Sequence, residues 1–170
     1  SVLVSYSGGK DSAVTLDLCT RFFKHVEAFF MYIVPGLSFQ EEFIRKAEHR
    51  YNINIYRIPH FMLSEFYRYG SFRAEDFDVP IVSVKETYDY MREKTGIYWI
   101  AAGERISDSL VRRAMIKHGG GSIDKTRGRF YPVAEWNKKD VMNYIRFRKL
   151  FVGRESKVLG FSFRSLEGLE

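Results

Sequence analysis

The stretch that decides the fold is SVLVSYSGGKDSAV, residues 1–14. Its apolar β-forming residues, Val2 to Val4, run directly into a serine- and glycine-rich turn, and helical spacing of apolar residues begins after Asp11. A strand that passes through a glycine turn into a helix exposes backbone N–H groups that have no partner within the helix. Such groups, together with the positive end of the helix dipole, bind anions. The stretch therefore predicts an α/β fold with an anion site close to Ser5–Ser12.

Further apolar segments alternate with segments of helical periodicity along the rest of the chain. We expect strands over residues 2–6, 28–34, 53–58, 98–102 and 130–132. We expect helices over residues 11–24, 39–51, 82–94, 107–117 and 138–150. Because the strands are nearly all apolar, this pattern predicts a Rossmann-like parallel β-sheet of about five strands sandwiched by helices. Such sheets bind ligands at the carboxyl ends of their strands, where segments 5–12, 34–36 and 103–105 would converge.

The composition of the 170-residue chain is that of a globular protein, with 45% hydrophobic and 16% aromatic residues. We expect a single domain over residues 1–170, and truncation of the given sequence at either end stays open. The formal net charge of +6 favours an anionic ligand, and phosphate, sulfate and nucleic acid all stay open. No apolar run is long enough for a membrane helix, so we expect a cytoplasmic protein. The single cysteine, Cys19, excludes an internal disulfide.

The residue types in the first loop suit a phosphate chain. Gly8 and Gly9 let the backbone turn and approach a phosphate closely, and Lys10 adds a compact positive charge. Asp11 is placed to cap the helix or to help hold a magnesium ion. The alternative is a tight turn with nothing bound. The candidate binding residues in this loop are Ser5, Ser7, Gly8, Gly9, Lys10, Asp11 and Ser12.

Three motifs give the chain a family resemblance. SGGKDS at 7–12 resembles the pyrophosphate-binding loop of the ATP pyrophosphatase superfamily. GERISDSLVRR at 103–113 and YPVAEWNKKDVMNYIRF at 131–147 resemble the phosphoadenylylsulfate (PAPS) reductases and the small subunit of bacterial ATP sulfurylase. The resemblance implies an adenine nucleotide alpha hydrolase-like fold, and it adds binding residues. These are Gly36, Gly103, Arg105, Asp108, Ser109 and Arg112.

The resemblance also implies a function: an enzyme that binds ATP, PAPS or adenylylsulfate (APS), with Mg as an additional ion. Lys10, Arg105 and Arg112 are the expected catalytic residues, because cations neutralise charge that develops on phosphate or sulfate oxygens. Two alternatives stay open, namely ATP-dependent adenylyl transfer to another acceptor and a silent nucleotide sensor or partner-binding module. Besides an adenine nucleotide, the expected partners are a partner protein or a second copy, with nucleic acid less favoured and no membrane.

The chain departs from the family in two places. At 34–36 it reads Val-Pro-Gly where the family has an Asp-Thr-Gly-like turn, so an acidic contact is missing although Gly36 is kept. The tail GFSFRSLEGLE lacks the cysteine of the family's reductases, and Cys19 falls on the buried side of a helix. Thiol-based reduction by this chain alone is therefore disfavoured. We assign no metal site to the scattered histidines, we expect a mobile loop over 117–128, and we interpret the aromatic segment 67–73 as a lid.

Overall fold

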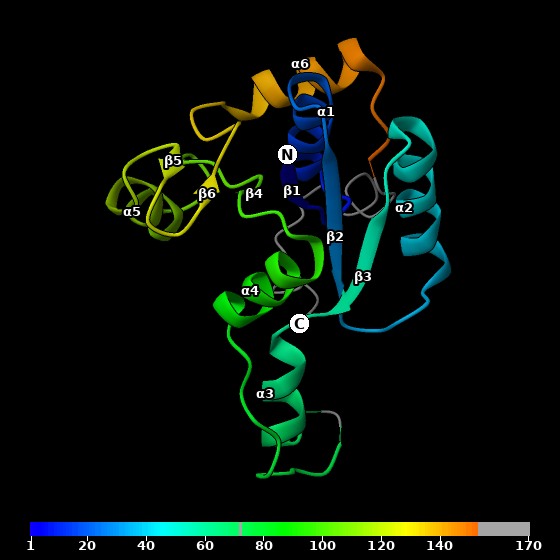
Figure 1. The fold of residues 1–170 in the computed structure, drawn as a ribbon, viewed down its shortest axis with the longest axis vertical. Helices are drawn as coiled ribbons and strands as arrows, with labels where there is room; N and C mark the ends of the chain where they lie inside the picture. Colours follow the sequence, from blue (N-terminus) through cyan, green and yellow to red (C-terminus); the bar gives the residue numbers. More distant parts are fainter. Residues whose placement is uncertain (72, 153–170) are drawn as a thin grey trace.

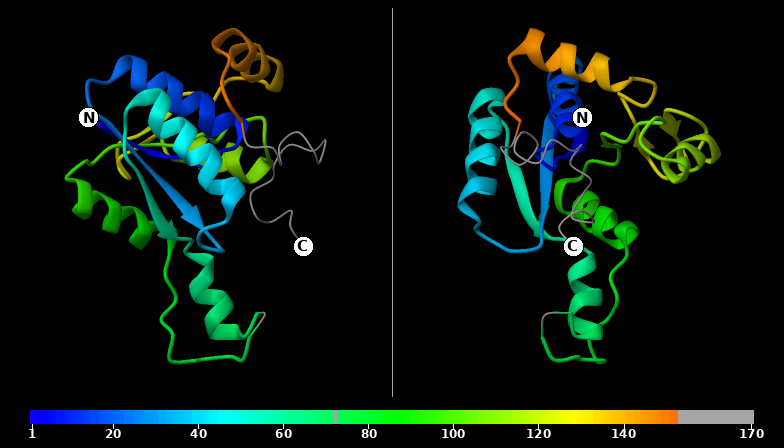
Figure 2. Two further views of the ribbon diagram at one scale, coloured as in Figure 1. Left: turned by 90° about the vertical axis from the view of Figure 1, so that its right-hand side faces the viewer. Right: turned by 180° about the vertical axis from the view of Figure 1, so that it is seen from behind.

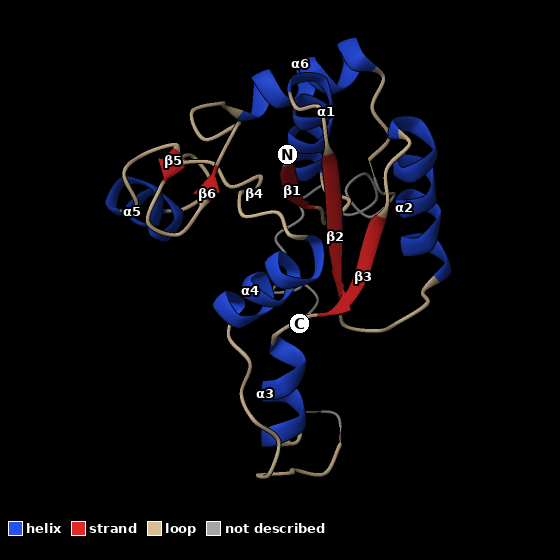
Figure 3. Ribbon diagram, viewed as in Figure 1, coloured by secondary structure: helices blue, strands red, loops and turns tan. Residues whose placement is uncertain are grey.

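A computed structural model describes residues 1–71 and 73–152, which form an α/β domain (Figure 1). The strands are β1 Val2–Ser5, β2 Val26–Tyr32, β3 Ile55–Pro59, β4 Ile100–Ala101, β5 Ile123–Asp124 and β6 Arg129–Phe130 (Figure 3). The helices are α1 Lys10–Phe22, α2 Ser38–Tyr51, α3 Met62–Tyr69, α4 Val84–Thr95, α5 Leu110–His118 and α6 Lys138–Arg148. No helix within these described residues is long and apolar enough to cross a bilayer.

The six strands form one sheet in the order β3-β2-β1-β4-β6-β5. All neighbouring pairs are parallel except β5 and β6. Strand β1 lies in the interior of this sheet, and its side chains alternate between the two faces. Val2 and Val4 pack in the core cluster that includes α1 and α2 residues, whereas Leu3 packs with α4 residues. Helices α1 and α2 therefore cover one face and α4 the other (Figure 2), as the apolar strands predicted.

The prediction of a parallel sheet flanked by helices is confirmed, and the sheet has six strands where about five were expected. Segment 117–128, which was expected to be a loop, is not a loop throughout. That segment contains the end of α5 and strand β5, which pairs antiparallel with β6. The side chain of Asp124, which is buried, holds the hairpin by accepting hydrogen bonds from the backbone N–H and the guanidinium of Arg127. Strand β5 is only two residues long, and it is surrounded by glycines and charged residues. The sequence pattern therefore did not indicate a strand there.

Helix α3 was not expected. It lies in a segment that projects from the sheet between β3 and α4 (Figure 1). The helix ends at Gly70, whose φ of +77° is the left-handed conformation that glycine tolerates. Only its last three residues, 67–69, belong to the aromatic segment 67–73 that we interpret as a lid, and the lid role stays a prediction. Phe72 of that segment lies outside the described residues, as does the tail at 160–170.

Helix α6 is fixed to the domain by a buried carboxylate. Asp17 of α1 is fully buried, and it accepts hydrogen bonds from Tyr51 of α2 at 2.9 Å and from Tyr144 of α6 at 2.8 Å. Arg148 of α6 donates to the same carboxylate at 3.0 Å. Trp136 also joins these elements, because it packs in a core cluster with residues of α1 and α6.

Candidate functional site

The loop between β1 and α1 has the geometry of an anion site. Gly8 has a φ of +75°, and a Cβ atom there would lie 2.3 Å from the ring of Phe43, so only glycine fits. Gly9 is the N-cap of α1. Because glycine has no side chain, it cannot cap the first N–H groups of the helix. Among the described residues, no group accepts from the backbone N–H of the first three helical residues, 10–12. These donors and the helix dipole therefore face the end of β1 without a partner.

The two loop serines brace each other. Ser12 Oγ accepts from the backbone N–H of Ser7 at 3.2 Å and donates to the carbonyl of Gly9 at 3.0 Å. The two hydroxyl oxygens lie 3.1 Å apart. Both serines thus hold the shape of the loop, and Ser7 keeps its exposure to solvent. Ser5 ends β1 and lies close to Tyr88 of α4.

A chain of alternating charges runs from this loop to α5. Lys10 Nζ lies 2.6 Å from one carboxylate oxygen of Asp11, and Arg105 Nε lies 3.1 Å from the other. Arg105 also donates from Nη2 to Asp108, whose second oxygen lies 3.7 Å from Nη1 of Arg112. The capping role considered for Asp11 is therefore wrong, because its side chain pairs with two cations and Gly9 occupies the cap position.

Arg105 is buried, with 5% of its side chain exposed. Its Nη1 forms no hydrogen bond with any atom of the described residues, and its Nε approaches Asp11 without the alignment of a hydrogen bond. A buried guanidinium with unpaired N–H groups costs free energy unless a ligand or water accepts from it. Among the residues predicted for the site, Arg105 has the geometry that most strongly favours a bound anion.

Gly103 explains how the two segments come together. A Cβ atom at this position would lie 2.9 Å from the backbone carbon of Asp11 and from the backbone nitrogen of Ser12. The residue after β4 thus contacts the first turn of α1 directly. Segments 5–12 and 103–105 meet as the sheet-edge argument predicted.

Gly36 and Ser109, the other predicted site residues, lie outside this chain of charges. Gly36 follows β2, the neighbour of β1, and adopts a φ of +73°. It borders a hollow of about 270 Å³, which is partly open to solvent. The hollow is lined by Phe30, Tyr32, Pro35, Gly36, Gln40, Glu41 and Arg57. Ser109 is the N-cap of α5 and accepts from the backbone N–H of Arg112 at 3.1 Å, so its hydroxyl has a structural partner.

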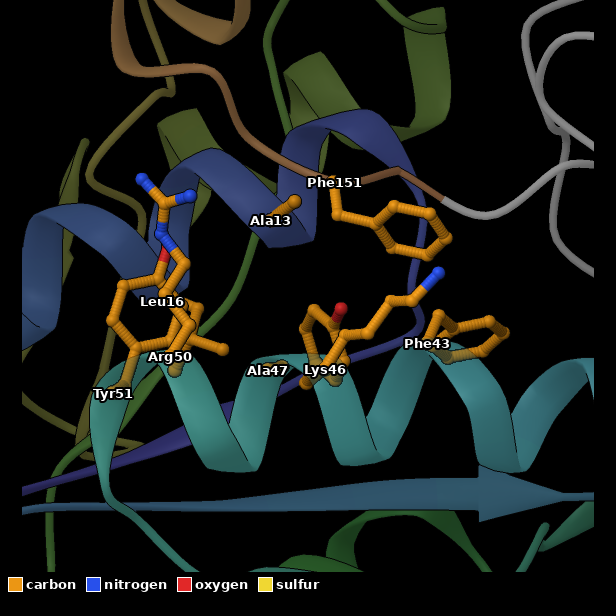
Figure 4. Close-up of a pocket in the computed structure, with 9 residues that line it drawn as sticks. Ala13, Leu16, Phe43, Lys46, Ala47, Arg50, Tyr51 and Phe151 are labelled. Atoms are coloured by element: carbon orange, nitrogen blue, oxygen red, sulfur yellow. The ribbon is translucent and has the colours of Figure 1, made fainter.

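A second hollow lies between α1 and α2 (Figure 4). Its lining is mainly apolar, and at its mouth the ammonium of Lys46 lies 4.0 Å from the ring centre of Phe151. The guanidinium of Arg50 donates to the carbonyls of Arg148 and Lys149. Because its cations already have partners, this hollow is a gap in the packing of two helices and does not resemble a phosphate site.

Sequence reasoning missed three polar residues on the α4 side of the same sheet edge. Glu104 has a carboxylate oxygen that is buried without a hydrogen-bond partner in the described residues, and burial raises its pKa. The Arg129 guanidinium lies 4.4 Å above the ring of Tyr88. Burial raises the pKa of Tyr88 to about 12. The signal for Glu104 was its place between Gly103 and Arg105 at a strand end.

Comparison with known proteins gives a family match and several similar folds. The family model described as phosphoadenosine phosphosulfate reductase domain matches residues 1–152. An uncharacterized protein of Methanocaldococcus jannaschii is 22% identical over 149 residues, which are 85% of this chain and 36% of the relative. The chain therefore spans about a third of the length of this curated relative.

Three solved structures share the fold. A PAPS reductase from Candida auris is 17% identical, with a TM-score of 0.61 over 96% of this chain and 82% of that chain. An NH3-dependent NAD synthetase from Campylobacter jejuni is 17% identical, with a TM-score of 0.62 over 98% and 71%. A U34-tRNA thiolase from Methanococcus maripaludis is 16% identical, with a TM-score of 0.60 over 90% and 57%. At these identities the likeness concerns the fold alone.

Proposed function

This chain belongs to the phosphoadenosine phosphosulfate reductase domain family, and from that membership we propose that it is an enzyme acting on ATP or an adenylylsulfate. The phosphate chain of the nucleotide binds at the start of α1. The observation that carries this proposal is that, within residues 1–71 and 73–152, three unpartnered helix N–H groups and the buried, partly unpaired Arg105 meet at one edge of the sheet.

The charges at this edge support a division of roles. Lys10 and the N–H groups of the first turn of α1 hold phosphate oxygens. Arg105 and Arg112 neutralise the charge that builds on phosphate or sulfate oxygens while a bond to phosphorus or sulfur breaks. The adenine lies at the end of β2, where the hollow beside Gly36 is lined on one side by Phe30 and Tyr32.

The residues present do not suit a protein-held magnesium ion in the loop. The carboxylate of Asp11 is already flanked by Lys10 and Arg105, so a cation there would meet two positive charges. Magnesium bound to the nucleotide would therefore be held by phosphate oxygens.

A second candidate reaction is adenylyl transfer to a different acceptor. The acceptor attacks the α-phosphorus of ATP, the new bond to phosphorus forms, and the bond to the pyrophosphate oxygen breaks. The state of Cys19 favours this reaction over thiol-based reduction. It is the one cysteine in the given sequence, it is 1% exposed, and burial raises its pKa to about 12. Reduction through a thiolate would need a cysteine from outside these 170 residues. A nucleotide sensor without catalysis is the third candidate.

Equilibrium binding by calorimetry, followed by product analysis, tests these candidates. Binding of ATP, adenylylsulfate or its 3′-phosphorylated form, with adenosine much weaker, is the expected result. Release of pyrophosphate and AMP-labelled product from α-labelled ATP would identify adenylyl transfer. Binding without any product under the same conditions would identify a sensor. Equal affinity for adenosine and all three nucleotides would contradict a phosphate site at α1.

A further inference from the structure

We propose that Asp108 is a positioning residue that aligns Arg105 and Arg112 for the phosphate or sulfate oxygens of the bound nucleotide. This inference deepens the proposed function and rests on it. The family resemblance placed Asp108 among the nucleotide-binding residues. In this proposal Asp108 contacts and orients the arginines, and they contact the nucleotide.

The contacts of Asp108 carry the argument. One carboxylate oxygen accepts from Nη2 of Arg105, and the other accepts from the backbone N–H of Arg105 at 3.2 Å. The second oxygen also lies 3.7 Å from Nη1 of Arg112. A single carboxylate thus holds the backbone and side chain of one arginine and attracts the other, which comes from the first turn of α5.

The effect on Arg105 is to leave one end of its guanidinium free. Asp11 lies beside Nε and Asp108 takes Nη2, while Nη1 is buried without a partner among the described residues. A planar guanidinium fixed along two edges presents its third donor in one direction. Arg112 complements it, because 39% of its side chain is exposed and it can meet a ligand from the solvent side.

A carboxylate beside an anion site would ordinarily oppose binding. Lys10, Arg105 and Arg112 carry positive charge here, and Asp11 and Asp108 carry negative charge. If Asp108 acted only through its charge, its removal would strengthen the binding of an anion. If it aligns the arginines, its removal will weaken that binding. The two roles therefore predict opposite signs.

The test measures the affinity of Asp108→Asn for inorganic pyrophosphate by calorimetry, and for adenosine by saturation-transfer NMR. We expect the affinity for pyrophosphate to fall about tenfold, the effect of misaligning one charge-assisted hydrogen bond, with adenosine binding unchanged. Asp108→Glu keeps the charge with a longer reach and should lie between parent and Asp108→Asn. Glu135→Gln is the matched control, because it removes a negative charge from an exposed residue and should not weaken pyrophosphate binding.

Unchanged or tighter pyrophosphate binding by Asp108→Asn would overturn the inference, as would an equal loss of adenosine binding, which indicates a general structural role. If Asp108→Asn does not fold, Asp108→Glu decides: it must bind pyrophosphate more weakly than the parent with adenosine binding retained, and parental affinity overturns the inference. Failure of the parent protein to bind either ATP or pyrophosphate would instead refute the proposed function.

Discussion

The charged residues of the loop are paired with each other before any ligand arrives. Lys10 has a largely buried side chain, with 12% exposed, and its ammonium contacts Asp11. Arg105 contacts the same carboxylate from the opposite side. Under the proposed function, the cations that a phosphate meets at this site are already held in place, because their side-chain entropy is lost on folding. Lys10 also neutralises Asp11, which would otherwise repel the phosphate.

Lys10→Ala should weaken ATP binding by roughly 1.5–3 kcal/mol, because a charge-assisted hydrogen bond is lost and Asp11 is left less neutralised. Calorimetric titration with ATP measures this loss, and adenosine should bind as it does to the parent. Lys85→Ala removes a lysine that is 80% exposed on α4, and it serves as the control for net charge. Parental affinity of Lys10→Ala for ATP would remove Lys10 from the site.

Cys19→Ser should lower the free energy of unfolding by roughly 1–3 kcal/mol, because a hydroxyl replaces a thiol in the core without an assured partner. Urea unfolding measures the change, and Cys19→Ala separates lost packing from the added polar group. The nucleotide affinity and turnover of the folded variant should equal those of the parent. Loss of turnover in a folded Cys19→Ser protein would restore a thiol mechanism.

The start of α1 is shaped by two elements that lie against it. Helix α2 contributes the Phe43 ring that contacts Gly8, and the end of β4 places Gly103 against the backbone of Asp11. The proposed anion site therefore depends on the packing of elements as well as on its own loop. Gly9 differs, since its φ is −72° and a Cβ atom there would meet only Ser7 Oγ, at 3.4 Å. The fold does not require glycine at this position.

Gly103→Ala and Gly9→Ala should therefore behave differently. Gly103→Ala forces β4 and α1 apart, and we expect a loss of roughly 1–3 kcal/mol of folding free energy together with weaker ATP binding. Gly9→Ala should keep most of the stability and weaken ATP binding, because its methyl group stands where the backbone meets a phosphate. Urea unfolding and ATP titration of both variants measure these effects. Gly9→Ala with parental ATP affinity would contradict the placement of the phosphate.

The described domain is tied together across its helices by one buried carboxylate. Asp17 links α1 to α2 through Tyr51 and to α6 through Tyr144 and Arg148. Burial raises the pKa of Asp17, but the hydrogen bonds from Arg148, Tyr144 and Tyr51 outweigh burial and hold the pKa below its ordinary value. The ionised form is thus favoured in the folded protein, and α6 depends on it.

Asp17→Asn should lower the free energy of unfolding by roughly 1–3 kcal/mol at neutral pH, because Tyr51, Tyr144 and Arg148 then donate to a neutral group in place of a buried charged acceptor. Since the folded pKa lies below the unfolded one, the contribution of Asp17 is complete above the unfolded pKa of about 4 and is lost as the pH falls through the folded pKa. The difference between parent and variant, measured by urea unfolding from pH 7 to pH 3, should shrink below about pH 4. Tyr144→Phe, which removes one hydrogen bond and no charge, should show a smaller difference. A difference independent of pH would contradict the ionised role of Asp17.

The sequence by itself determined the class of fold and the first loop. Apolar strands that alternate with helical periodicity predict a covered parallel sheet, and SGGKDS between strand and helix predicts an anion site at their junction. Helix α6 was also predictable, because Asn137 and Asp140 form a capping box at its start. These features depend on side-chain period and backbone conformation within a few residues. Local chemistry is therefore sufficient to predict them.

Only the tertiary structure decided which distant charges meet. Asp11 pairs with Arg105, and Asp17 pairs with Arg148, across separations that no local pattern encodes. These pairs follow from β4 lying beside β1 and from α6 packing on α1. The physical reason is that the periodicity of apolar residues determines which face of a helix or strand is buried. The order of strands in the sheet then determines which residues that face contacts.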